Sequence, residues 1–208
     1  MNRLLISLAL MALLGACGSS PAPRYYTLGA SADIAPAIGA EADALSIWVA
    51  PVTLPEAVDR PQLVVRVAPN RVAILDGHRW AEPLAGAISR TIAADLSALL
   101  GGARVSSEAQ HGAASAQVRV LVDVQRFESV PGQGVTIEAL WSVHRAAEIT
   151  PPRTPQRTLQ GTPQREPQYG HSLVSEPATG SDYDALAVAH ARALAAVSRD
   201  IAQAIRPR

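Results

Sequence analysis

Residues 117–144 decide the fold, and they read QVRVLVDVQRFESV, then PGQG, then VTIEALWSVH. On both sides of PGQG, apolar residues alternate with polar ones, which is the period of a strand with one buried face. Proline and glycine in 131–134 are typical of a turn, and Phe127 falls out of phase, which indicates a β-bulge. The sequence therefore predicts two long antiparallel strands joined as a hairpin. We expect Trp141 to be buried between this hairpin and a helix.

Two amphipathic helices are predicted around the hairpin. The first follows Pro83, with apolar residues at helical spacing over 84–99 and glycines at 101–102 that end it. The second has its apolar stripe over 186–205, and the residues before it resemble a capping box with Ser181 as the cap. Both patterns are those of helices that cover a sheet.

Shorter strands are predicted from alternation and from aromatic and β-branched content. They span residues 24–28, 45–50, 63–67, 72–75 and 104–106. Prolines at five positions between 150 and 168 disfavour a central strand there, so we expect no more than an edge strand at 157–162. The element order predicts a single α+β domain, with two long helices packed on one face of a mostly antiparallel sheet.

The N-terminus has the features of a bacterial lipoprotein signal. An apolar stretch over 4–14 follows Arg3, and small residues at 15–16 precede Cys17, the one cysteine of the chain. As a helix, about eleven residues reach only about 17 Å, well short of the roughly 30 Å hydrocarbon core. We predict removal of residues 1–16 and acylation of Cys17. An ordinary secretory signal with a chance cysteine is the alternative.

The expected mature chain has two parts. Residues 17–43 form the lipid anchor and a flexible tether that carries the short strand at 24–28, and residues 44–208 form the α+β domain. Gly18 follows the anchor, in place of the Asp that commonly retains bacterial lipoproteins in the inner membrane. By that sorting rule, we expect the protein at the periplasmic face of the outer membrane.

Charge and composition exclude several kinds of function. The chain has 18 basic and 18 acidic residues, so no global field attracts nucleic acid, and we expect no nucleic-acid partner. The familiar hydrolase, nucleotide-binding and zinc-protease motifs are missing from the sequence. The histidines are scattered without ligand-like spacing, at His78, His111, His144, His171 and His190. We expect no catalytic residue, metal or cofactor, and His190 on the second apolar stripe reads as a core residue.

Two polar clusters mix charge with proline, at 54–62 and 78–84. A structural interpretation assigns Glu82 to the positive end of a helix dipole and Arg79 to stacking on an aromatic ring. A functional interpretation makes the clusters a partner-binding surface. Its candidate residues are Asp59, Arg60, Gln62, Arg79, Trp80 and Glu82.

Five strings occur in the order known from one family. They are the lipobox ending at Cys17, Tyr25-Tyr26-Thr27-Leu28, Val49-Ala50-Pro51-Val52, Asp59-Arg60-Pro61-Gln62 and Arg79-Trp80-Ala81-Glu82-Pro83-Leu84. Together they resemble the ABC-type transport auxiliary lipoproteins, in particular the paraquat-inducible protein C type. The resemblance covers nearly the whole mature chain. The chain departs from the family at 150–170, where it is richer in proline.

The resemblance implies a non-enzymatic accessory of a lipid-transport system. Its partners would be a periplasmic MCE (mammalian cell entry) protein and the inner-membrane component of that system, with homo-oligomerisation left open. Two rival functions stand beside this one: a lipid-anchored periplasmic hydrolase, which would need Ser, His and a carboxylate to converge, and a stand-alone lipid carrier, which would need its own apolar cavity.

Overall fold

The computed structural model of the chain describes residues 22–35, 45–101, 103–108, 113, 115–146 and 166–206. In chain order, its elements are β1 (Arg24–Tyr26), β2 (Ser46–Val49), β3 (Gln62–Ala68), β4 (Arg71–Trp80), α2 (Leu84–Leu100), β5 (Arg104–Ser106), β6 (Val118–Val130), β7 (Gly134–Arg145), β8 (Gln168–Pro177) and α4 (Tyr183–Ile205). They form one α+β domain, which confirms the predicted fold class. In this part of the chain, neither helix is long and apolar enough to cross a membrane.

The strands form two sheets, whereas the sequence predicted one. A five-stranded sheet has the order β5-β2-β6-β7-β8, and a three-stranded sheet has the order β1-β4-β3. The long pairings are antiparallel, but β2 runs parallel to β5 and β6, and β1 runs parallel to β4. Parallel neighbours need a crossover connection, and between β2 and β5 the chain passes through α2.

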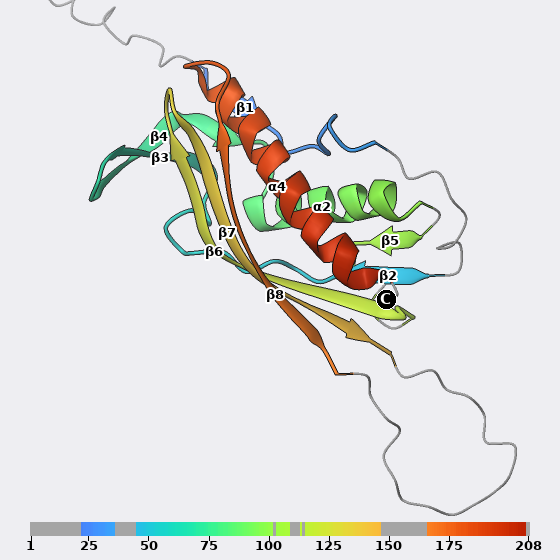
Figure 1. Cartoon of the computed structure of the whole chain (residues 1–208). Helices are drawn as coiled ribbons and strands as arrows, with labels where there is room; N and C mark the ends of the chain where they lie inside the picture. Colours follow the sequence, from blue (N-terminus) through green and yellow to red (C-terminus); the bar gives the residue numbers. More distant parts are fainter. Residues whose placement is uncertain are drawn as a thin grey trace, which may run out of the picture.

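The predicted long hairpin is β6–β7, and its register shifts between Val124 and Arg126. This bulge returns Phe127 to the buried face of β6, so the out-of-phase residue was read correctly. In the turn, Gly132 has a φ of 72°, a left-handed conformation that favours glycine. The hairpin spans most of the length of the domain (Figure 1).

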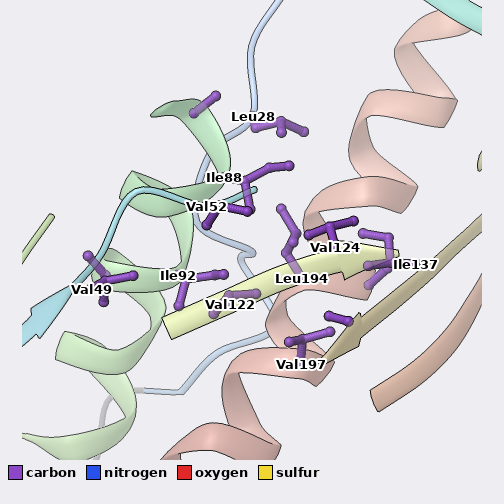
Figure 2. Close-up of a cluster of buried hydrophobic side chains, with 14 of the residues drawn as sticks. Leu28, Val49, Val52, Ile88, Ile92, Val122, Val124, Ile137, Leu194 and Val197 are labelled. Carbon is purple, nitrogen blue, oxygen red and sulfur yellow. The ribbon is translucent and has the colours of Figure 1, made fainter. Parts of the chain in front are cut away.

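Both helices cover one face of the five-stranded sheet, as predicted (Figure 1). Figure 2 shows how α2, α4 and the sheet meet: Ile92, Leu194 and Val122 point into one apolar cluster. α4 is capped by Asp182, whose Oδ1 accepts a hydrogen bond from the N–H of Ala185 at 2.8 Å. The predicted cap Ser181 is therefore wrong by one residue, because the Asp182 carboxylate caps the helix and also favours its positive end.

β8 was not predicted, and the edge strand expected at 157–162 falls outside the described residues. β8 lacks the usual pattern of large apolar residues on its buried face, so alternation in the sequence did not indicate a strand there. Its large apolar residues Tyr169 and Leu173 face away from the helices, with 76% and 59% of their surfaces exposed, whereas Ser172 is buried on the inner face. β8 nevertheless pairs with β7 along its whole length.

Trp141 is half-buried, so the expectation that it would be buried is only partly met. Its ring lies over Gly170 of β8, where an added Cβ would come within 2.1 Å of a ring carbon. The indole N–H donates to Ser172 Oγ at 3.0 Å, and Ser172 donates to Asp200 of α4 at 2.6 Å. Trp141 thus links β7, β8 and α4 through one hydrogen-bonded chain.

Part of the predicted tether packs on the domain. Tyr26, Leu28 and Ile34 are buried, and Leu28 joins the main apolar cluster. The strand expected at 24–28 is β1, which is shorter and ends at Tyr26. Tyr26 and Leu28 therefore attach this part of the chain to the same core as the sheets.

Candidate functional site

The two polar clusters of the sequence meet in the structure. Gln62 and Arg79 are paired residues of the β3–β4 hairpin, and the N–H of Trp80 donates to the carbonyl of Pro61 at 2.7 Å. β1 brings a third string to the same place, because Tyr25 is paired with Arg79. We call the solvent-facing side of 55–62 and 79–82, together with Tyr25, the motif surface.

A compact turn shapes the first half of the motif surface. The carbonyl of Pro55 accepts the N–H groups of Val58 at 3.0 Å and Asp59 at 3.2 Å. At the start of this loop, the N–H of Val52 donates to Ser89 of α2 at 3.1 Å. Pro61 lacks an N–H and fixes its own φ, so it suits the entry to β3. Backbone contacts therefore define this loop, and Val58 packs against the core.

Three candidate residues lie in or directly after that loop. Asp59 is exposed, and its side chain makes no hydrogen bond or ion pair within the described residues. Arg60 and Gln62 are half-buried, and the Nε of Arg60 is buried without a hydrogen-bond partner in the described part of the chain. Asp59 and Arg60 thus present groups that the fold itself does not use.

Arg79 and Glu82 lie on the second half of the surface, and both are half-buried. The Nε of Arg79 donates to the carbonyl of Asp76 at 3.0 Å. Glu82 forms an ion pair with Arg90, nearly two helical turns into α2. The helix-terminus interpretation of Glu82 agrees with this placement, while Arg79 is held by a carbonyl where that interpretation expected an aromatic ring.

Trp80 differs from the other candidates because it belongs to the core. Only 6% of its surface is exposed, and its ring meets Phe127 and His190 edge-on at centroid distances of 6.1 and 6.2 Å. The prediction that Trp80 contributes to a partner-binding surface is corrected by this burial. Its role is to fix β4 against β6 and α4.

His190 is a core residue, as expected. Its ring stacks on Phe127 at 3.9 Å, and its Nε2 lies 2.8 Å from Ser129 Oγ. Burial lowers the pKa of His190 to about 3. A neutral ring with no route to solvent and with Nδ1 unpartnered among the described residues is poorly placed to act as a general base.

Other polar pairs lie on the outer face of the five-stranded sheet. Ser142 is 2.9 Å from His144, and His171 is 3.1 Å from Glu138. In the described ranges, these contacts do not combine into a Ser-His-carboxylate chain, and no group of three potential ligands could hold a metal ion. Cys17 and His111 lie outside the described residues.

The sequence reading missed one buried charge, Asp95 of α2. It has no exposed surface, its Oδ2 accepts a hydrogen bond from Ser198 of α4 at 3.1 Å, and its Oδ1 has no hydrogen-bond partner among the described residues. Burial raises the pKa of the Asp95 carboxyl to about 6. The available signal was its position within the apolar stripe of the first helix, where a carboxylate needs partners.

The domain resembles two solved structures. A crystal structure of an uncharacterized protein has a TM-score of 0.67 and 20% identity, and the match covers 89% of this chain and 99% of that one. Protein XCC0632 from Xanthomonas campestris, of the family model DUF330, has a TM-score of 0.63 and 20% identity, over 86% of this chain and 92% of that one. At this identity, the likeness establishes the fold. A comparison with curated proteins finds no significant match.

The comparison with protein families establishes more than the fold. A model described as "ABC-type transport auxiliary lipoprotein component" matches residues 26–202. The match begins in β1 and ends in α4, so it includes both halves of the motif surface. The chain therefore belongs to the ABC-type transport auxiliary lipoprotein family.

Proposed function

We propose that the mature chain is a lipoprotein acylated on Cys17 and held at the periplasmic face of the outer membrane. There it serves as a non-enzymatic accessory of an intermembrane lipid-transport system, between a periplasmic MCE protein and an ABC-type inner-membrane component. Family membership, the lipobox and Gly18 support this proposal. Two or more acyl chains give stable anchoring, whereas a single chain gives only marginal binding.

The motif surface is the observation that carries the proposal. Residues 59–62 and 79–82 are distant in sequence, yet backbone hydrogen bonds bring them together. Asp59 and Arg60 then present charged groups beside one another without a partner in the described fold. A surface with unused charged groups and a rigid backbone suits recognition of another protein.

The rival functions find less support. The hydrolase needs an accessible Ser-His-carboxylate group, but the Ser129–His190 pair is buried. The lipid carrier needs an apolar cavity, but apolar side chains from both helices and both sheets fill the interior. A surface cleft between β8 and α4 is lined largely by polar groups, among them Gln168, Asp200 and Gln203.

The partner interface can be tested with Asp59→Ala combined with Arg60→Ala. We expect the double variant to lose pull-down of the MCE protein while its melting temperature stays nearly unchanged, because neither side chain makes a hydrogen bond or ion pair with the described part of the fold. A matched control is Arg126→Ala with Glu138→Ala, which removes an ion pair of 3.6 Å from the outer face of the sheet. Normal pull-down by the first variant, with early melting, would contradict the proposed surface.

Anchoring has its own test, Cys17→Ser. This variant lacks the thiol that receives the diacylglyceryl group, so we expect no incorporation of labelled palmitate and an uncleaved precursor in the inner membrane. The wild-type chain should sediment with outer-membrane markers on a density gradient. Palmitate on the variant would refute acylation at Cys17, and a dominant inner-membrane signal from the wild type would refute the sorting argument.

A further inference from the structure

The β3–β4 hairpin is apolar on both faces. On its inner face, Leu63 and Val65 are 3% and 2% exposed and pack toward β6. On the other face, Val72 and Ile74 keep 50% and 47% of their surfaces exposed, and Val67, at the register shift beside the turn, keeps 48%. Strands that are apolar on both faces are typical of sheets covered on both sides. The free face of this hairpin therefore has the composition of a covered surface.

These exposed residues lie together at the turn end of the hairpin. Ile74 is paired with Val64, and Val72 with Arg66, so the four side chains share one face. Val67 lies at the register shift next to the turn. In Figure 1, the β3–β4 hairpin extends away from the layer of helices, and its tip lies apart from α2 and α4.

The turn end of the hairpin itself carries only basic charges. Residues 62–75 contain two arginines and no Asp or Glu; Arg66 is paired with Glu128 of β6 at 2.6 Å, and Arg71 is exposed beside the turn. The exposed apolar residues of the five-stranded sheet have a different setting, because Leu140 lies between Asp123 and His171 in the register. Apolar side chains flanked by arginine fit the boundary between anionic headgroups and acyl chains.

The position of the anchor decides which surface covers the hairpin. β1 runs parallel to β4 with Arg24 opposite His78, so the N-terminal end of β1 is its end nearer the hairpin turn. From His78 back to Arg71 the strand covers about 23 Å, at about 3.3 Å per residue. Cys17 precedes Arg24 by seven residues, which span at most about 25 Å. The hairpin tip is therefore within reach of the membrane that would hold Cys17.

We propose that the turn end of the β3–β4 hairpin rests in the interface of the membrane that holds acylated Cys17. Val67, Val72 and Ile74 enter the boundary between headgroups and acyl chains, and Arg71 lies among the lipid phosphates. This inference rests on the proposed acylation of Cys17. Anchor and hairpin together form two points of contact that fix the orientation of the domain. The motif surface, at the opposite end of β4, is then held away from lipid and faces the periplasm.

The test uses the full-length acylated chain, reconstituted into vesicles of phosphatidylethanolamine and phosphatidylglycerol. Acylation occupies the Cys17 thiol as a thioether, so Val72→Cys supplies the one free thiol for an environment-sensitive fluorophore. The matched control is Tyr169→Cys, also on an exposed apolar residue. In the sheet register, Tyr169 and Leu121 are both paired with Ser142 of β7. Leu121 lies seven residues along β6 from Glu128, whose side chain contacts Arg66 of the hairpin at 2.6 Å.

We expect spin-labelled lipids to quench the fluorophore at position 72 at least about twofold more strongly than the fluorophore at position 169, because only the hairpin enters the interface. Flotation of the protein with the vesicles reports the anchor separately. If the protein floats but both fluorophores are quenched equally and weakly, the hairpin contact is overturned and the anchor stands. The hairpin contact is also overturned if the fluorophore at position 72 becomes shielded from solvent only when the MCE protein is added. A protein that does not float would overturn acylation, and the hairpin contact with it.

Discussion

The two sheets of the molecule differ in how their faces are covered. The five-stranded sheet packs one face under α2 and α4 and turns the other, which carries ion pairs, to solvent (Figure 1). In the three-stranded sheet, the β3–β4 hairpin packs on β6 and leaves an apolar face half-exposed. The large sheet therefore builds the core, and the small sheet presents surfaces: the motif surface at one end of β4 and the apolar hairpin end at the other.

Trp80 joins these two regions, so its removal should have the largest effect. Trp80→Ala deletes a buried ring that contacts Phe127 of β6 and His190 of α4. We expect a loss of about 3 to 5 kcal/mol in the free energy of unfolding, measured by urea titration. Trp141→Ala is the control within the large sheet, and its loss should be smaller because Trp141 is only half-buried. A loss at Trp80 no larger than at Trp141 would mean that the small sheet does not share the core.

One glycine from each sheet allows the tightness of packing in the two sheets to be compared. A Cβ on Gly170 of β8 would come within 2.1 to 2.5 Å of the ring of Trp141, while a Cβ on Gly77 of β4 meets nothing within 4 Å. We expect Gly170→Ala to destabilise the fold by about 1 to 3 kcal/mol through overpacking. Gly77→Ala should change stability by less than about 0.5 kcal/mol, as at other open surface sites. Equal effects in thermal unfolding would contradict the tight packing of β7 on β8.

Regular patterns made the large sheet predictable, with one exception. Alternation predicted β6 and β7, and one out-of-phase residue, Phe127, placed the bulge. β8 was missed because it turns Tyr169 and Leu173 outward and places Ser172 under α4. A polar inner face is stable there because Ser172 bonds to Trp141 and Asp200, which are contacts between distant residues that a local pattern does not contain.

The candidate site was predictable as a set of residues but not as a surface. Sequence strings identified Asp59, Arg60 and Arg79, and the structure brings them to one side of the small sheet. The same strings included Trp80, which is a core residue although its neighbours in the sequence are polar. Asp95 was not singled out, because its partner comes from another helix.

Two buried titratable groups mark the two regions, and their effects on stability have opposite signs. His190, beside Trp80 at the junction of the sheets, has its pKa lowered from 6.5 to about 3 by burial. The unfolded chain then binds the extra proton, so stability falls as pH drops below 6.5. Asp95, within the helix layer, has its pKa raised from 3.8 to about 6. The folded chain then binds the extra proton, so stability falls as pH rises through 6.

Asp95→Asn separates these two effects and gives the smallest change. Asn keeps an acceptor for Ser198 but has no charge to bury, so the variant should lose only the part of the pH dependence that Asp95 contributes. Relative to the wild type, the variant should gain about 1 kcal/mol of stability between pH 5 and pH 8, since one pKa unit corresponds to about 1.4 kcal/mol. Urea titrations of both chains at the two pH values measure this difference, and subtracting the wild-type curve removes the shared contribution of His190. A difference that stays constant between pH 5 and pH 8 would show that Asp95 is already ionised in the folded chain at pH 5. Arg199, the nearby cation that lowers the pKa of Asp95, would then stabilise this charge within the helix layer.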